Sequence, residues 1–514
     1  MATASRPAID VDGLGGRRAA PAAVPAAVTV VTGALAAVLG ALTHYGGGLW
    51  QLVVLIAILI CMGLAAWLLT YRQFIQLVAI LFAFTFPMRL NVELWPFPQI
   101  RVRSGMPPGV ALWHLDLFLL ILWTDWFVDV CLHRARPSAR IGPAARWLGL
   151  MFLAAAFFPV HTTYLPASVM LYVEFLRYGL AFVYLAKKVD SVTVLRWMVY
   201  GICAQVWIES LIAWAQYAAG GTLGLRFLGE TRLREEPVEG GAILRTGALM
   251  GHPNRFAEWL VLVGPYPLAM ALQRRLSLSA RAFFWATFVV LNVSLILTFS
   301  RAGWVCAAFN ALATYHLALR RLGKPIVVSL WTPLIAGVAV CVFLIVAVEE
   351  VRARLFSDDR GSTFARIPQF VTALNMIAHR PFFGVGLGSY SANIHRFANF
   401  DGRYLSTLYF RVHNGLLLWT AETGVLGGFS YLMFWFHNLK KGWGVWRLKD
   451  DFLALTGIAT VIGLISWWIK SMYNIHSPLT DYPMWMHAAM IYVVYNCAAR
   501  LQREQDAAAA PAAT

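Results

Sequence analysis

Long apolar runs recur along almost the whole chain and constrain its fold more than any other feature. The hydrocarbon core of a bilayer requires roughly twenty apolar residues per helix. Because 59% of the 514 residues are hydrophobic and only 13% are charged, the composition excludes an ordinary soluble protein. We therefore predict an all-α polytopic membrane protein with about 12–14 transmembrane helices. The expected spans lie near residues 24–44, 50–70, 73–88, 109–132, 145–160, 166–186, 194–217, 255–272, 282–300, 302–319, 326–348, 415–436, 453–470 and 482–499.

Basic residues in the short loops indicate the orientation of these spans, because cytoplasmic loops are enriched in Lys and Arg. Such residues follow alternate spans, as Arg72, Lys187 and Lys188 do. Both termini are then cytoplasmic, and two long loops face outward. The expected organisation is a cytoplasmic tail at 1–23, transmembrane helices at 24–217, a first periplasmic loop at 218–254, central transmembrane helices at 255–349, a large Arg-rich periplasmic loop with short helices at 350–413, C-terminal transmembrane helices at 414–499 and a cytoplasmic tail at 500–514.

The two outward loops contain arginine but no lysine, and Lys470 is the single lysine expected toward the outside. Guanidinium groups are planar, bidentate donors that suit phosphate or carboxylate. A genome that favours arginine would explain the same bias without any function. The larger loop carries Arg352, Arg354, Arg360, Arg366, Arg380, Arg396, Arg403 and Arg411.

His413 and Asn414 stand directly before the apolar run that begins at Gly415. Asn414 is suited to be the N-cap of that helix. His413 would then lie just outside the positive end of the helix dipole, a setting that favours a neutral imidazole able to accept a proton. The alternative is a capping Asn beside a histidine that only hydrogen-bonds a neighbour.

Arg301, in "LTFSRAGWV", stands at the outer end of two spans with almost no loop between them. A cation at a helix N-terminus works against the helix dipole, and an anionic ligand would compensate. The alternative is an arginine that extends from the bilayer interface toward water.

An amphipathic helix is expected at about residues 363–378, with Arg366 on its first turn, followed by the Gly-rich "GVGLG". The glycines suit a close-packed loop better than a phosphate-binding turn, since no strand precedes them. The earlier loop ends with Arg245, His252 and Arg255, which could join the same outer site. The Pro253 that follows His252 also suits a plain helix start.

Charged residues inside the expected spans need partners. Glu174 and Arg177 are three apart on one helix and could pair, and Glu422 is a further candidate site residue. These charges form no repeat between the halves of the chain, which disfavours an inverted-repeat transporter. The cysteines and histidines show no spacing typical of metal ligands, so no metal site is expected.

Three sequence blocks together resemble the bacterial O-antigen ligases and related polysaccharide polymerases, which are membrane glycosyltransferases. They are "SRAGW" at 300–304, the segment from Arg366 to "RPFFGVGLGSY" ending at Tyr390, and "HNGLLLWTAETGVLG" at 413–427. The resemblance covers residues 245–435 and implies a GT-C-like, multi-pass enzyme of the bacterial inner membrane with its active site facing the periplasm. It also implies no cofactor and no nucleic acid partner.

The resemblance further implies that Arg301 and Arg366 bind the diphosphate of an undecaprenyl-diphosphate-linked glycan and that His413 acts on the acceptor hydroxyl. Expected supporting residues are Asn414, Arg245, His252, Arg255 and Glu422. A diphosphate leaves readily once its charge is neutralised, whereas a sugar hydroxyl needs a base. Implied partners are the acceptor glycan or lipid A core, the lipid bilayer, and a chain-length regulator and flippase of the same pathway.

The acceptor stays open at this point. Polymerisation of O-antigen or exopolysaccharide repeat units is favoured, because the long basic loop could hold a second anionic lipid-linked substrate. A ligase would transfer the glycan to lipid A core, and some relatives use a protein hydroxyl. Two other classes compete, namely a flippase or transporter of lipid-linked oligosaccharides and a non-catalytic subunit that only grips lipid diphosphates.

Overall fold

The computed structural model describes residues 56–65, 69–85, 91–96, 109–132, 142–238, 241–356, 366–398, 411–473 and 482–509. The expected N-terminal tail at 1–23, the span at 24–44, the first part of the span at 50–70 and the last residues of the C-terminal tail lie outside these residues. Arg360 and Arg403 of the large loop do so as well.

The described chain is predominantly helical, and the predicted all-α polytopic membrane protein is confirmed. Among the described residues, seven helices are long and apolar enough to cross a membrane, and a shorter apolar helix lies at Ile56–Ala65. Helices also occupy the other expected spans from residue 73 onward. The helices are α3 (Tyr71–Thr85), α4 (His114–Leu132), α5 (Pro143–Ala156), α6 (Leu165–Lys188), α7 (Val192–Ala219), α8 (Pro253–Val263), α9 (Pro265–Ala271), α10 (Leu278–Leu297), α11 (Arg301–Arg321), α12 (Ile326–Ala347), α13 (Glu349–Phe356), α14 (Arg366–His379), α15 (Tyr390–Phe397), α17 (Gly415–Trp443), α18 (Asp451–Ser471) and α19 (Tyr482–Ala509).

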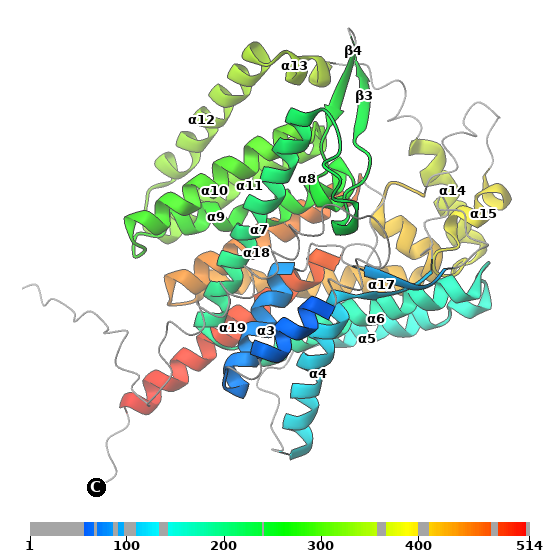
Figure 1. Cartoon of the computed structure of the whole chain (residues 1–514), viewed down its shortest axis with the longest axis horizontal. Helices are drawn as coiled ribbons and strands as arrows, with labels where there is room; N and C mark the ends of the chain where they lie inside the picture. Colours follow the sequence, from blue (N-terminus) through cyan, green and yellow to red (C-terminus); the bar gives the residue numbers. More distant parts are fainter. Residues whose placement is uncertain are drawn as a thin grey trace, which may run out of the picture.

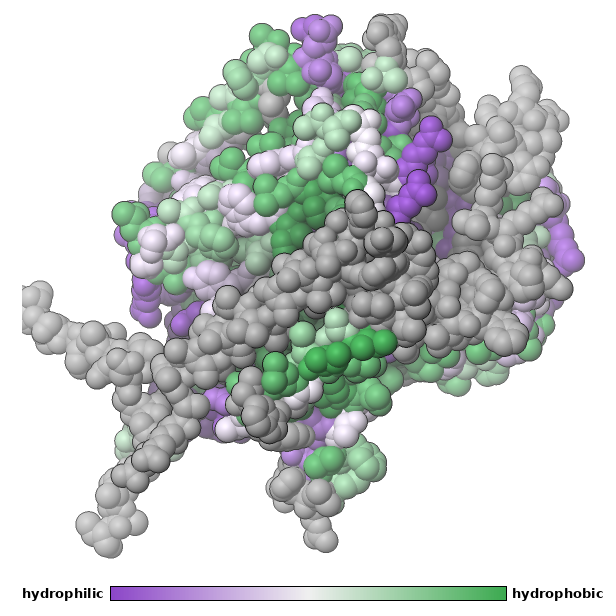
Figure 2. Space-filling view, in the orientation of Figure 1, coloured by the Kyte–Doolittle hydropathy of each residue, from purple (hydrophilic) through white to green (hydrophobic). Residues whose placement is uncertain are grey.

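The most deeply buried of the candidate spans is α18, which packs against α8, α9, α11, α17 and α19 (Figure 1). By contrast, α12 packs on α11 and leaves its long apolar window exposed, as expected for a helix in contact with lipid. Hydrophobic side chains cover the α10–α12 region, and hydrophilic ones gather at the β3–β4 hairpin (Figure 2).

Two short antiparallel hairpins correct the purely helical expectation. Strand β1 (Asn91–Pro96) pairs with β2 (Gly109–Trp113), so the first residues of the span expected at 109–132 are a strand and the helix begins at His114. In the first long loop, β3 (Arg234–Val238) pairs with β4 (Gly241–Arg245). Strands this short carry too few residues for a clear period-two pattern in sequence.

The buried arginine of α6 takes its carboxylate from another helix. Arg177 pairs with Asp116 of α4, whereas the sequence suggested Glu174, three residues earlier on the same helix. Asp116 also accepts a hydrogen bond from the backbone N–H of Trp113, at 2.8 Å. Because α4 packs on α6, the interhelical partner is available there, which spacing along one helix cannot reveal.

Candidate active site

A tight turn joins α10 to α11 and ends at Arg301, the first residue of α11. Phe299 has φ 47°, in the left-handed region. Non-glycine residues held in that region cost roughly 1–3 kcal/mol, so neighbouring contacts must hold the turn. Ser300 is the N-cap of α11, and its hydroxyl accepts a hydrogen bond from the N–H of Gly303 at 3.4 Å.

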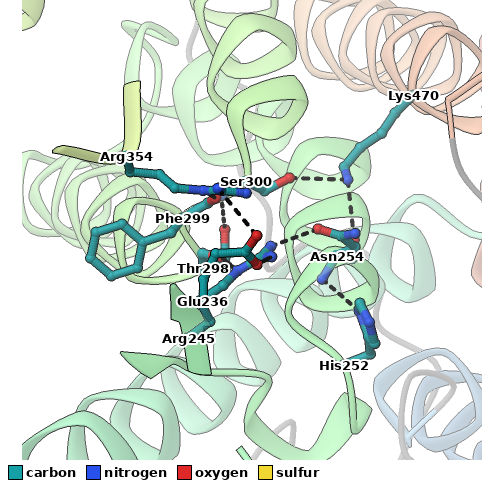
Figure 3. A network of polar contacts seen from close by, with 9 residues as sticks. All are labelled: Glu236, Arg245, His252, Asn254, Thr298, Phe299, Ser300, Arg354 and Lys470. Atoms are coloured by element: carbon teal, nitrogen blue, oxygen red, sulfur yellow. Dashed lines mark hydrogen bonds and ion pairs between the residues drawn. The ribbon is translucent and has the colours of Figure 1, made fainter. Parts of the chain in front are cut away.

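Three cations from three different elements hold this turn, which we call the 298–300 turn (Figure 3). Arg245 of β4 donates from Nε to the carbonyl of Thr298 at 2.9 Å. Arg354 of α13 donates from Nε to the carbonyl of Phe299 at 3.3 Å. Lys470 of α18 donates from Nζ to the Ser300 hydroxyl at 3.5 Å.

The guanidinium of Arg245 is buried and engaged at three points. Besides Thr298, it contacts Glu236 at 2.9 Å and the side-chain oxygen of Asn254 at 2.8 Å. Burial lowers the pKa of Arg245, and the partner Glu236 opposes that shift. Glu236 also pairs with Arg354 at 3.3 Å, so one carboxylate links β4 to α13. Arg245 thus fastens the β3–β4 hairpin to the 298–300 turn and to the start of α8.

His252 and Arg255 lie at the N-terminus of α8. His252 is the N-cap, and its Nδ1 accepts the backbone N–H of Asn254 at 3.0 Å. Since that partner can only donate, a neutral His252 carries its proton on Nε2. Arg255 is partly buried in the first turn of α8. Both residues therefore lie beside Asn254, which Arg245 and Lys470 also contact.

His413 is hydrogen-bonded to Gln369 of α14, a residue that sequence reasoning did not single out. The side-chain oxygen of Gln369 lies 2.7 Å from Nδ1 of His413 and 3.3 Å from the backbone N of the same residue. The backbone N–H can only donate, so that amide atom is an acceptor, and Nδ1 must carry a hydrogen. In a neutral His413 the basic lone pair is then on Nε2.

The same contact brings α14 and the start of α17 together. Arg366 begins α14 and is partly buried, and Gln369 follows it by one turn on the same face of the helix. Gln369 therefore links His413 to the first turn of the helix that begins at Arg366. The outer helix that the sequence predicts from about residue 363 is present, and its described part starts at Arg366.

Asn414 is the N-cap of α17, as the sequence predicts, and its side-chain oxygen accepts the N–H of Leu417 at 2.9 Å. Its amide nitrogen donates to the carbonyl of Met472 at 3.4 Å. Met472 lies two residues after Lys470, whose Nζ contacts the Asn254 carbonyl at 3.2 Å as well as Ser300. The C-terminal end of α18 therefore touches both the Arg301 side and the His413 side of the site.

The Gly-rich turn packs on a break in α17 and does not form an open phosphate-binding loop. Gly424 interrupts α17 with φ 79° and ψ 179°, which leaves backbone groups without helical partners. The Gly-rich turn supplies hydrogen-bond partners for these groups. The N–H of Val385 donates to the Ala421 carbonyl at 2.8 Å, and the N–H of Val425 donates to the Pro381 carbonyl at 2.7 Å. A side chain at Gly384 would collide with this backbone, so the close-packed loop expected from the sequence is confirmed.

Glu422 fastens the same turn from inside α17. Its side chain is 1% exposed and accepts the backbone N–H of Tyr390 at 3.4 Å. Tyr390 in turn donates its hydroxyl to the carbonyl of Gln369 at 3.0 Å. Burial raises the pKa of Tyr390, so this hydroxyl keeps its proton. Glu422 thus acts on the site through Tyr390 and Gln369.

In the part of the chain that the structure describes, no group of three or more His, Cys, Asp or Glu residues could hold a metal ion. The starts of α8, α11, α14 and α17 instead carry several cations and one oriented imidazole. Such a set can neutralise an anionic group and accept a proton nearby. Two residues here were not assigned to the site from the sequence. Lys470 had a signal in its expected outward position without any other lysine, and Gln369 had one in its spacing from Arg366.

Residues 286–432 match the protein family described as O-Antigen ligase. The matched segment runs from α10 into α17 and includes Arg301, Arg366 and His413, so it confirms the resemblance drawn from the three sequence blocks. Arg245 and the rest of the first long loop lie outside the matched segment, and so does Lys470 of α18. None of the curated proteins compared with the chain matches it.

Proposed function

We propose, from the premise that residues 286–432 form an O-antigen ligase domain, that this membrane protein is a glycosyltransferase of the bacterial inner membrane. It would transfer a glycan from an undecaprenyl-diphosphate-linked donor to an acceptor hydroxyl at the periplasmic face, with both termini in the cytoplasm. The observation that supports the proposal is a set of hydrogen bonds that links the end of α18 to the starts of α11 and α17, and the start of α17 to α14, where Gln369 orients His413.

Arg301 and Arg366 are proposed to bind the diphosphate of the donor. The developing charge on a departing diphosphate is stabilised by guanidinium groups, which can take over the task that a metal ion or a general acid has elsewhere. The N-terminus of α11 adds the positive end of a helix dipole at Arg301. Arg255, in the first turn of α8, is proposed to support the same site. Arg245 and Glu422 are proposed to stabilise it through the backbone that they hold.

His413 is proposed to act as the general base. The acceptor O–H gives its proton to Nε2 of His413 while its oxygen bonds to the anomeric carbon of the donor glycan. The bond from that carbon to the diphosphate oxygen breaks, and undecaprenyl diphosphate leaves with the electron pair. Gln369 holds the Nδ1–H, so the basic nitrogen stays Nε2 throughout the approach.

Polymerisation of O-antigen or exopolysaccharide repeat units remains our proposal for the acceptor. It is supported by exposed arginines of the large loop, Arg352 on α13 and Arg380 directly after α14, which could accompany a second anionic lipid-linked substrate. Ligation to lipid A core is the second candidate, and the description of the matched family favours it. The two differ in product: a ladder of lengths from polymerisation, and one transfer per acceptor from ligation.

The test is glycan transfer by purified protein in detergent, with an undecaprenyl-diphosphate-linked repeat unit as donor and either the same molecule or lipid A core as acceptor. We expect His413→Ala to lower kcat by about 10²–10⁴-fold while donor binding is kept. Arg301→Ala and Arg366→Ala should weaken donor binding as well. Exposed Arg396→Ala, on α15, serves as the control.

A flippase, transporter or binding subunit predicts another pattern. Such a protein would bind or move the donor without forming a glycosidic bond, and His413→Ala would change little. Full transfer activity in folded His413→Ala would refute the base assignment. Absence of any new glycosidic bond with the wild-type protein and both acceptors would refute the enzyme.

A further inference from the structure

Lys470 differs from the other lysines of the chain in place and in burial. Its side chain is 2% exposed, at the end of the central helix α18, on the side where the arginine-only loops lie. A lysine side chain is almost never buried to this degree unless it is paired. Lys449, just before α18, shows the ordinary case of an exposed lysine.

Two hydrogen bonds of Lys470 reach the starts of α8 and α11, and the second start carries Arg301. Its Nζ donates to the Ser300 hydroxyl at 3.5 Å and to the Asn254 carbonyl at 3.2 Å (Figure 3). Ser300 caps α11 and directly precedes Arg301. The ammonium therefore bridges the starts of α8 and α11 from the side opposite Arg245 and Arg354, which hold the Thr298 and Phe299 carbonyls.

The strained backbone of the 298–300 turn depends on the contacts that hold it, including the hydrogen bond from Lys470. Phe299 has φ 47°, in a region that costs a non-glycine residue free energy, and Arg301 is two residues further on. If one of the three cations is removed, the turn can relax toward an unstrained conformation. The direction of the Arg301 side chain would change with it, although Lys470 itself need not touch a ligand.

The end of α18 also connects this turn with the base. Met472 accepts a hydrogen bond from Asn414, the residue after His413, at 3.4 Å. The end of α18 thus contacts Ser300, which precedes Arg301, and Asn414, which follows His413. Group transfer requires the anionic leaving group and the base to be held in one geometry, since small displacements cost large factors in rate.

We propose that Lys470 is a positioning residue that orients Arg301 toward the diphosphate of the donor by holding the 298–300 turn. This inference rests on the proposed function, because it concerns the binding of the same anionic donor. It assigns a role to a residue outside the matched family segment. A plain role in helix packing is the competing explanation, and it predicts a loss of stability without any link to Arg301.

The experiment is a double-mutant cycle read out as binding of undecaprenyl diphosphate to the full-length protein in detergent. The variants are Lys470→Met, Arg301→Ala and the combination, with exposed Lys449→Met as the matched control. We expect Lys470→Met to weaken binding by about tenfold in the otherwise wild-type protein and by less than about twofold in the Arg301→Ala background. Lys470→Arg should restore most of the affinity.

Equal losses of affinity in the two backgrounds would overturn the proposal, because Lys470 would then act independently of Arg301. Unchanged affinity in Lys470→Met would overturn it too. If Lys470→Met does not yield folded protein, Lys470→Gln takes its place under the same criterion. A wild-type protein that does not bind undecaprenyl diphosphate refutes the proposed function and this inference together, whereas binding with an additive cycle refutes this inference alone.

Discussion

Replacing Gln369 by leucine tests whether the orientation of His413 matters to the reaction. The Gln369 oxygen accepts from Nδ1 at 2.7 Å and from the backbone N–H of His413 at 3.3 Å. Each net hydrogen bond contributes about 1 kcal/mol. Loss of the ring contact lets the imidazole rotate and exchange tautomers. A cost of about 1.4 kcal/mol in the transition state corresponds to a tenfold lower rate.

We therefore expect Gln369→Leu to lower the single-turnover rate of glycan transfer by about tenfold, well short of the loss in His413→Ala. Gln369→Glu keeps the acceptor and should retain more activity than the leucine variant. Donor affinity should change little in either protein, which separates this effect from damage to α14. A rate for Gln369→Leu equal to that of the wild type, or as low as that of His413→Ala, would refute the reasoning.

Three further predictions concern stability, each measured as the midpoint of thermal unfolding in detergent. Gly424→Ala should lower the free energy of unfolding by roughly 2 kcal/mol, because a Cβ there would collide with the Phe382 carbonyl and φ is positive. Its control is Gly337→Ala on α12, where a Cβ meets open space and should not destabilise the protein. Arg245→Met should lower the free energy of unfolding by about 3 kcal/mol, because it leaves the buried Thr298 carbonyl and the Glu236 carboxylate without the Arg245 hydrogen-bond donor. The same change at exposed Arg234 should have little effect. Asn414→Ala removes a helix cap and should cost about 1 kcal/mol. Equal midpoints for a variant and its control, or for Asn414→Ala and the wild type, would contradict these accounts.

Local patterns in the sequence determined the membrane-spanning class and, for most of the spans among the described residues, the approximate position. The apolar stretches at 194–217 and 302–319, for example, became α7 and α11 with ends within a few residues of the expectation. A helix inside a bilayer must satisfy its own backbone hydrogen bonds, so length and hydrophobicity decide its presence. The same locality explains the N-cap at Asn414, because a cap depends only on residues a few positions away.

The sequence was less informative where a residue depends on distant neighbours. The hairpin at residues 91–113 lay partly inside an expected span, and Arg177 took a partner from another helix. The break in α17 at Gly424 was also unseen, because its freed backbone groups are satisfied by a turn forty residues earlier in the chain. Each case depends on which segments pack together.

For the candidate site, the sequence alone supplied the residue types: Arg301 and Arg366 as cations in the outer region and His413 at a helix start. Only the tertiary structure decided that Gln369 orients His413 and that the end of α18 joins both sides of the site. The physical reason is that a hydrogen bond or an ion pair acts over a few ångströms, while its partners here lie 44 to 170 positions apart in the chain. Hydrophobic patterning selects which helices enter the bilayer, and helix packing selects which of their ends meet.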